Sequence, residues 1–246
     1  MPFIPAGYGG LEATRAALAG LAKAGASVIE VGIPFSDPIA DGPTIQAAYH
    51  ETLQSGVTLD GCLDAIGETK IDAPMLAMVS YSVVRRRGDR AFCERAKAVG
   101  LTGLLCPDLP PPEAERFCET AKASGLDPVL LVAPTTPAAR RDAIGKLAGG
   151  FVYYLSVAGI TGQRDALPPD LAAGVADMKG RTDLPVCVGF GISKAEHLRQ
   201  LAGVADGAIV GSAFVRAVEA AKQYGPVAVA AACEEMAREL LATVRE

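Results

Sequence analysis

The chain has 246 residues, 50% of them hydrophobic, and a formal net charge of −5. This length and composition allow one large α/β barrel or a pair of smaller domains. The scattered lysines and arginines exclude a basic face for nucleic acid, and charges interrupt every apolar segment long enough to cross a membrane.

The cysteines also limit the class of protein. Six cysteines occur singly, with no Cys-x-x-Cys pair and only two histidines. This pattern is typical of reduced thiols in a cytoplasmic protein, and it offers no metal site by spacing. The start of the chain, MPFIPAGYGG, has no basic segment and no long apolar segment, so we expect no signal peptide.

Short apolar runs alternate with longer amphipathic ones along the chain, which predicts repeated β–α units and a parallel sheet. Strands are expected at Phe3–Pro5, Val28–Val31, Met75–Val79, Gly103–Cys106, Pro128–Val132, Val152–Ser156, Val186–Gly189 and Ala208–Val210. Helices are expected at Leu11–Ala24, Thr44–Leu53, Leu59–Thr69, Asp89–Val99, Pro112–Ser124, Pro137–Leu147, Pro169–Lys179, Lys194–Ala202, Ala213–Gln223 and Val227–Val244.

Glycines support three of the predicted helix ends. Gly25, Gly100 and Gly125 each follow an alanine-rich helix, at the position where glycine accepts the left-handed conformation that ends a helix. The basic run 85–87 is expected in a surface loop.

Eight strands with intervening helices predict a closed (β/α)8 TIM barrel, with residues 1–246 forming a single domain. The alternative is an open doubly wound sheet, which more often carries a glycine-rich turn after its first strand. The segment AGYGG at residues 6–10 is a candidate for that turn, but it lacks the full spacing. We therefore expect the barrel, and we expect function at the C-terminal ends of its strands.

One carboxylate stands within a predicted strand. Val28, Glu30 and Gly32 share one face because side chains alternate along a strand, and the purely apolar residues between them would face the helices. Glu30 then points into the barrel, where burial should raise its pKa toward a range useful for acid–base catalysis. A purely structural carboxylate, hydrogen-bonded to backbone or hydroxyl groups, is an equal alternative on position alone.

Two aspartates, Asp37 and Asp41, follow in the loop after this strand. Taken alone, Asp37 suits a turn and Asp41 suits a turn or a helix N-cap. Three glycine-bearing segments favour a ligand site over these purely structural roles. AGITG (158–162), GFGIS (189–193) and GSAF (211–214) follow three successive predicted strands. Loops at these positions commonly bind phosphate in barrels. No lysine ends a predicted strand, which disfavours a Schiff-base aldolase.

These segments together resemble the tryptophan synthase α subunit family. The resemblance rests on EVGIPFSDPIADGPTIQ (30–46), PDLP (107–110), YYLSVAGITG (153–162), GFGIS (189–193) and GSA (211–213), and it runs through nearly the whole chain. It implies a lyase that cleaves indole-3-glycerol phosphate to indole and glyceraldehyde 3-phosphate. It further implies no cofactor in this chain, a β subunit that holds pyridoxal phosphate, and an α2β2 heterotetramer.

The resemblance also implies roles for individual residues. Glu30 matches the family's general acid–base carboxylate, and Asp41 matches the aspartate that accepts a hydrogen bond from the indole N–H. The positions that match substrate-binding residues are Tyr153, Thr161, Gly162, Phe190, Gly191, Gly211 and Ser212. The positions that match the surface facing the β subunit are Asp37, Pro107, Asp108 and Pro110.

The chain departs from the family pattern at its start, after its third strand, and at Pro112, where an acidic residue is more usual. Family members usually carry a helix before the first strand, whereas only Met1 and Pro2 precede Phe3 here. After the third strand, where a tyrosine-rich stretch is common, this chain has Ser80-Tyr81-Ser82. Two alternatives to the lyase therefore stay open: a weakly active binding subunit that activates a β subunit, and another phosphate-binding barrel enzyme.

Overall fold

The computed structural model describes residues 1–39, 41–156, 167–189, 191–192 and 195–245. Its strands are β1 (Phe3–Pro5), β2 (Ile29–Gly32), β3 (Met75–Met78), β4 (Gly103–Leu105), β5 (Asp127–Val132), β6 (Val152–Leu155), β7 (Val186–Gly189) and β8 (Gly207–Ala208). Its helices are α1 (Leu11–Ala24), α2 (Pro43–Gln54), α3 (Leu59–Glu68), α4 (Tyr81–Arg87), α5 (Asp89–Ala98), α6 (Pro111–Ala123), α7 (Ala138–Leu147), α8 (Leu171–Lys179), α9 (Ala195–Leu201), α10 (Ser212–Ala221) and α11 (Pro226–Arg245), with a 3-10 turn η1 (Lys222–Tyr224).

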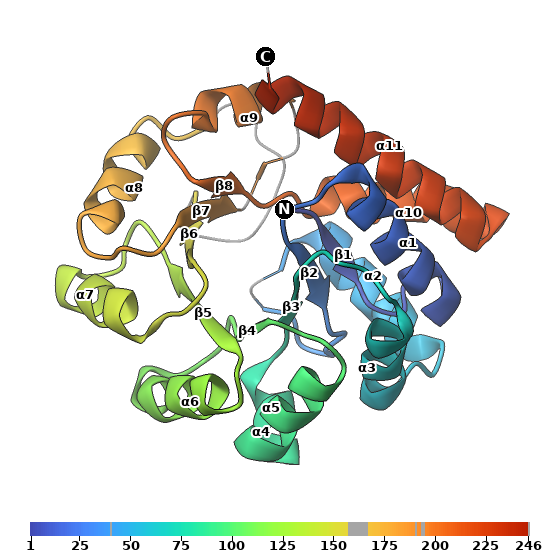
Figure 1. Ribbon diagram of the computed structural model, residues 1–246, viewed down its shortest axis with the longest axis horizontal. Helices are drawn as coiled ribbons and strands as arrows, with labels where there is room; N and C mark the ends of the chain where they lie inside the picture. Colours follow the sequence, from blue (N-terminus) through green and yellow to red (C-terminus); the bar gives the residue numbers. More distant parts are fainter. Residues whose placement is uncertain (40, 157–166, 190, 193–194, 246) are drawn as a thin grey trace.

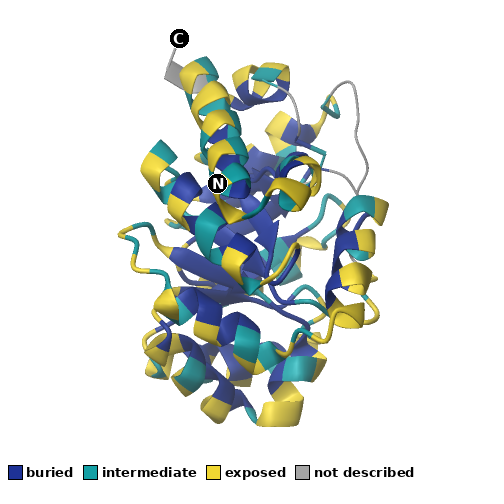
Figure 2. Cartoon of the chain, turned by 90° about the vertical axis from the view of Figure 1, so that its right-hand side faces the viewer, coloured by how far each residue is buried: buried dark blue, intermediate teal, exposed yellow. Residues whose placement is uncertain are grey.

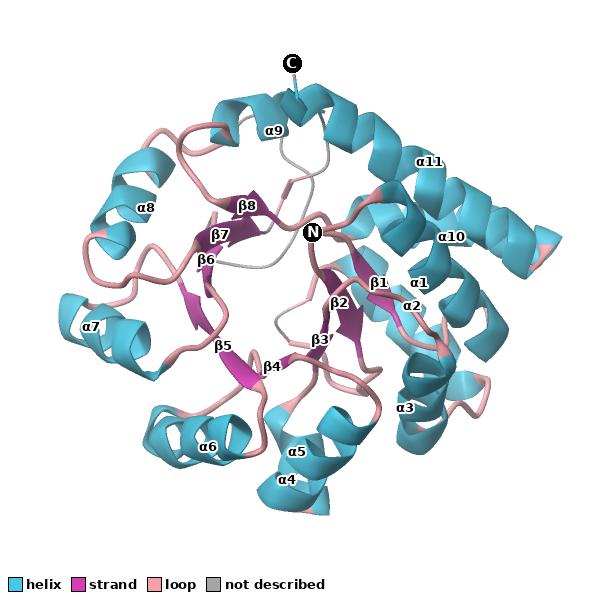
Figure 3. Ribbon diagram, viewed as in Figure 1, coloured by secondary structure: helices cyan, strands magenta, loops and turns pink. Residues whose placement is uncertain are grey.

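The strands form one parallel sheet in the order β1 to β8, and the helices surround it (Figures 1 and 3). The ring closes between its last and first strands, where Phe3 N–H donates to the Val210 carbonyl at 2.9 Å and Val210 N–H donates to the Met1 carbonyl at 2.9 Å. This closure confirms the predicted TIM barrel and rules out the open doubly wound sheet.

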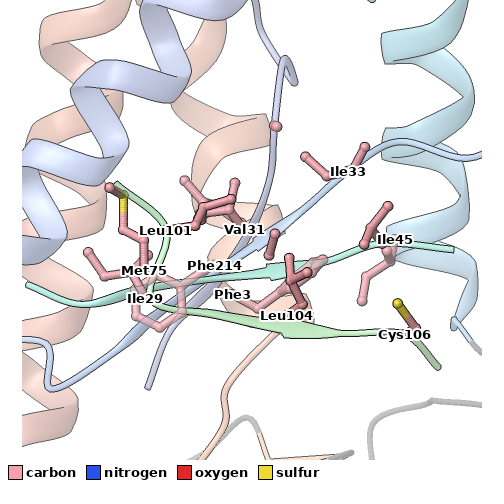
Figure 4. Packing of buried hydrophobic residues seen from close by; sticks show 14 of the residues in the cluster. Phe3, Ile29, Val31, Ile33, Ile45, Met75, Leu101, Leu104, Cys106 and Phe214 are labelled. Atoms are coloured by element: carbon pink, nitrogen blue, oxygen red, sulfur yellow. The ribbon is translucent and has the colours of Figure 1, made fainter. Parts of the chain in front are cut away.

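Alternation along β2 divides the core into two layers. Ile29 and Val31 are fully buried between the sheet and the helices, beside Met75 and Phe214 (Figure 4). Inside the barrel lies a separate apolar cluster, Leu76, Leu105, Val129, Phe151, Tyr153, Cys187 and Ile209. The helices bury one face against the sheet and expose the other, as the banded colouring in Figure 2 shows. Glu30 therefore belongs to the interior layer, as the alternation predicted.

The glycine turns behave as expected. Gly25, Gly100 and Gly125 have φ values of +91°, +86° and +75°, in the left-handed region that ends a helix. One prediction was wrong: Arg85, Arg86 and Arg87 lie in the last turn of α4 and not in a loop. That helix begins at a cap that the sequence did not reveal, because the Ser82 N–H donates to Ser80 Oγ and the Tyr81 N–H donates to Asp108 Oδ1 at 2.7 Å.

Helix α11 packs on α1 (Figure 1), and Gly20 of α1 lies against the backbone of α11. A Cβ at Gly20 would overlap the Ala230 carbonyl oxygen and lie 3.1 Å from its carbon.

Because these atoms of Ala230 belong to the backbone, we expect Gly20→Ala to lower the free energy of unfolding by about 1–3 kcal/mol, measured by urea denaturation. Gly61→Ala in α3 is the control: its nearest neighbours are side-chain atoms at 3.3 Å, so we expect a change below about 1 kcal/mol. Equal effects of the two substitutions would contradict this account of the helix contact.

Candidate active site

Glu30 lies in the interior of the barrel, on β2 between Phe3 of β1 and Leu76 of β3. The side chain is 2% exposed, and its Oε1 has no hydrogen-bond partner within the described chain. Burial, and then the nearby charge of Asp41, raise the pKa of Glu30 to about 8. The pKa is thus raised as expected, and no backbone or hydroxyl group of the described residues is hydrogen-bonded to Oε1, whereas such a bond would be expected for a structural carboxylate.

Asp41 is also buried, although it stands in a loop. Two hydrogen bonds hold the backbone of Asp41: its N–H donates to the Pro38 carbonyl at 3.0 Å, and its carbonyl accepts from the side-chain Nε2 of Gln46 at 2.7 Å. The N-cap of α2 is Gly42, and no side chain caps that helix. Asp41 therefore does not serve as the cap. Burial raises the pKa of its carboxyl to about 7.

Both carboxyl groups line one pocket of about 270 Å³ at the C-terminal ends of the strands. Its lining residues are Phe3, Glu30, Asp41, Gly42, Pro43, Thr44, Ile45, Met78, Tyr153, Gly191, Ile192, Ile209, Gly211, Ser212 and Arg216. Six of the residues singled out in the sequence come together here: Glu30, Asp41, Tyr153, Gly191, Gly211 and Ser212. Thr161, Gly162 and Phe190 lie outside the described residues.

One wall of this pocket suits an anion. Gly211 is the N-cap of α10 and Ser212 its first residue, and no side chain caps the helix. Gly191 faces the same space with φ +77°. Backbone N–H groups at such a helix start, approached closely because glycine has no side chain, favour a negatively charged ligand. Arg216, one turn into α10, also lines the pocket.

Tyr153 stands on β6 opposite Cys187 of β7. Its hydroxyl and ring occupy the space above Gly189, where a Cβ would overlap them. The sequence drew attention to Gly189 only as part of a glycine loop; its spatial role is to admit a large side chain from the neighbouring strand. The available signal was a glycine on the interior face of a strand.

Sequence analysis missed several other lining residues, among them Met78, Ile209 and Arg216. The first two are apolar residues on or beside the strand ends. Arg216 could have been found from its position four residues after Ser212, which puts both on one face of a helix.

A second hollow of about 230 Å³ adjoins the first, and it shares Asp41 and Met78 with it. Asp37, Pro107 and Asp108 line this hollow. Asp108 joins two loops, because its Oδ2 accepts from Ser80 Oγ at 2.6 Å and its Oδ1 accepts from the Tyr81 N–H. Pro110 is exposed at the N-cap of α6. The residues that match the partner-facing surface thus lie beside the pocket on the same side of the barrel.

In the described part of the chain, no group of three or more histidine, cysteine, aspartate or glutamate side chains could hold a metal ion. Within those same ranges, no helix is both long and apolar enough to cross a membrane.

Comparison with known proteins gives consistent matches over nearly the full chain. A family model described as tryptophan synthase alpha chain matches residues 1–245. The tryptophan synthase alpha chain of Rhodopirellula baltica is 44% identical over 245 residues, covering 96% of this chain and 88% of the relative. That of Synechococcus elongatus is 43% identical over 239 residues, covering 96% and 89%.

Solved structures agree with these sequence matches. A Mycobacterium tuberculosis tryptophan synthase structure superposes with a TM-score of 0.87 at 35% identity, covering 100% of this chain and 91% of that one. A structure of the tryptophan synthase a2b2 complex from Pyrococcus furiosus gives a TM-score of 0.89 at 36% identity, covering 98% and 96%.

Proposed function

This chain belongs to the tryptophan synthase alpha chain family, and from that premise we propose that the pocket at the barrel mouth is its active site. The chain is a carbon–carbon lyase of tryptophan biosynthesis: it cleaves indole-3-glycerol phosphate to indole and glyceraldehyde 3-phosphate. The proposal assigns that reaction to particular residues of one barrel domain.

Glu30 is proposed as the general acid and base. Its protonated carboxyl gives a proton to carbon 3 of the indole ring, and its carboxylate then takes the proton of the glycerol hydroxyl next to the ring. The carbon–carbon bond breaks, the hydroxyl carbon becomes an aldehyde, and the electron pair returns to the ring to form indole. A pKa of about 8 keeps the acid form available at neutral pH, so one carboxyl can serve both steps.

Asp41 is proposed to accept a hydrogen bond from the indole N–H. Protonation of carbon 3 places positive charge on the ring nitrogen, and a carboxylate held beside it stabilises that charge most strongly where water is excluded. Asp41 is 8% exposed and lines the same pocket as Glu30. The two carboxyl groups therefore have different tasks: the protonated Glu30 transfers protons and the ionised Asp41 stabilises charge.

The substrate phosphate is proposed to bind at the N-terminus of α10, against Gly191, Gly211 and Ser212. The family resemblance adds Thr161, Gly162 and Phe190 to this group, and Tyr153 beside the ring. The supporting geometry is the start of α10, which no side chain caps and which lines the same pocket as the two carboxyl groups.

A partner is proposed on the side of the second hollow. The similar Pyrococcus furiosus chain belongs to an a2b2 complex with mutual activation. We infer the same assembly here, with Asp37, Pro107, Asp108 and Pro110 facing the β subunit and pyridoxal phosphate held there. We further infer that the protein works in the cytoplasm, in keeping with six cysteines that are all free and buried.

The observation that carries the assignment is the pair of buried carboxyl groups facing one pocket, one of them with an unpartnered oxygen. A chain that acted only as a binding subunit would gain stability by replacing them, since burying a carboxyl without partners is costly. Another phosphate-binding barrel enzyme would need the glycines at the anion-binding wall of the pocket, but it would not need the two buried carboxyl groups.

An indole-release assay, run with and without a β subunit, tests the proposal. We expect the isolated chain to release indole from indole-3-glycerol phosphate, and we expect a bound β subunit to raise the rate because Asp41 stands in a loop beside the proposed interface. If the rate of indole release were the same with and without a saturating β subunit, the β subunit would not activate this chain. If no indole were released under either condition, the proposal that this pocket is the active site would be wrong.

A further inference from the structure

Tyr49 is a buried residue of α2 that neither the resemblance nor the mechanism above uses. Its side chain is 2% exposed and lines the second hollow. The hydroxyl lies over Gly32 of β2, where a Cβ would overlap it and would also lie 2.6 Å from the Phe3 ring. Gly32 is two residues beyond Glu30 on the same interior face of β2. The hydroxyl thus reaches the strand that carries the catalytic acid.

This hydroxyl has no hydrogen-bond partner in the described part of the chain, and its oxygen is buried. Two other buried hydroxyls have hydrogen-bond partners. Thr52, one turn further along α2, donates to the Ala48 carbonyl at 2.8 Å. The Tyr81 hydroxyl donates to Asp89 Oδ2 at 3.3 Å. An unpartnered buried hydroxyl lowers stability, and a phenylalanine would fill the same space without that cost. Packing of the ring therefore does not account for the oxygen.

The hydroxyl stands among the groups of the proposed site. Tyr49 and Asp41 line the second hollow together, and Asp41 also lines the first pocket beside Glu30. Burial, and then the charges of Asp41 and Glu30, raise the pKa of Tyr49 well above its ordinary value. The phenol stays protonated through the neutral range, so it can only donate a hydrogen bond to an ionised neighbour.

We propose that Tyr49 is a positioning residue that acts through Asp41: when substrate fills the pocket, its hydroxyl donates a hydrogen bond to the Asp41 carboxylate. This bond holds the carboxylate ionised and aimed at the indole N–H. Asp41 is the acceptor because it lines the second hollow together with Tyr49, whereas Glu30 does not line that hollow. The proposal rests on the function proposed above for this pocket.

Tyr49→Phe keeps the ring and removes the oxygen. We expect kcat for indole release to fall about ten- to hundredfold, the value of a hydrogen bond to a charged group. We expect KM, and the affinity for glycerol 3-phosphate, to stay within about twofold of the wild-type values, because the substitution does not change the proposed phosphate site at the start of α10. We also expect Tm to rise by roughly 2–4 °C, because the variant no longer buries an unpartnered hydroxyl.

Tyr81→Phe is the matched control. The Tyr81 ring is buried in the outer core against Phe117, and its hydroxyl donates to Asp89 Oδ2 at 3.3 Å and accepts from Arg116 at 3.0 Å. That variant should keep the wild-type kcat and lose stability, the opposite of what we expect for Tyr49→Phe in both measurements.

A double-mutant cycle with Asp41→Asn decides whether the hydroxyl acts through Asp41. We expect Tyr49→Phe to have less than about a twofold effect on kcat in the Asp41→Asn background, because the two changes remove the same interaction. Additive losses, a wild-type kcat in Tyr49→Phe, or a fall in kcat accompanied by a lower Tm would each overturn the proposal. If the wild-type chain released no indole, the function proposed for this pocket would itself be wrong, and so would the role of Tyr49.

Discussion

Glu30→Gln lowers kcat for indole release by about 10⁴-fold, the upper end of what a single proton-transferring group contributes. The loss is large because one carboxyl performs both the protonation of the ring and the deprotonation of the hydroxyl. Glutamine has nearly the same shape and no exchangeable acid proton, so the pocket geometry survives. We expect the dissociation constant for glycerol 3-phosphate, measured by calorimetry, to change less than about twofold.

The same substitution has an opposite effect on stability, and its sign follows from the pKa. The pKa of Glu30 is raised from 4.5 to about 8 in the folded chain, so the folded state binds the proton more tightly than the unfolded state. The stability contributed by this protonated group is full below about pH 4.5 and is lost as the pH rises through about 8. The Tm of Glu30→Gln should therefore exceed that of the wild type by an amount that grows between pH 5 and pH 9.

Glu235→Gln serves as the matched control, since Glu235 is exposed on α11. It should change neither kcat nor the dependence of Tm on pH. Turnover near the wild-type rate in Glu30→Gln would show that another group moves the protons. A Tm difference that stays constant with pH would show that Glu30 is not held in its protonated form.

The sequence was enough to predict the barrel and the interior position of Glu30, because both follow from periodicity that is local to each strand. It could not predict α4. The apolar run at Val83 and Val84 and the three arginines give no helical signal, and the helix begins with a bond from the Tyr81 N–H to Asp108, 27 residues away.

In the candidate site too, the sequence identified individual residues, but it did not predict contacts between residues of different strands and helices. The family resemblance singled out Asp41 and Tyr153, but it did not explain Gly189, whose role depends on the register of β6 beside β7. Tyr49 was missed because its helical spacing with Ile45 and Ala48 marks the buried face of α2, which is typical of ordinary core packing. The approach of its hydroxyl to Gly32 depends on how α2 packs against β2, and the spacing along α2 does not encode that contact.

Asp41→Asn lowers kcat by about 10²- to 10³-fold, the usual loss when one preorganised group that stabilises developing charge is removed. An amide oxygen still accepts from the indole N–H, but it carries no charge to balance that of the protonated ring. Asp72→Asn, at an exposed position before β3, should leave kcat unchanged. A fall in kcat below about threefold for Asp41→Asn would show that the ring charge is stabilised elsewhere.

The pH dependence of kcat/KM then identifies the two carboxyl groups separately. Activity needs Asp41 ionised and Glu30 protonated, so the wild-type profile should rise near pH 7 and fall near pH 8, following the pKa values of about 7 and about 8. In Asp41→Asn the rise near pH 7 should disappear, leaving at most the ionisation of the substrate phosphate near pH 6. The fall should move to lower pH, because the charge of Asp41 helps to raise the pKa of Glu30. An alkaline limb unmoved by the substitution would mean that the two groups do not act on each other, and the division of roles between them would not stand.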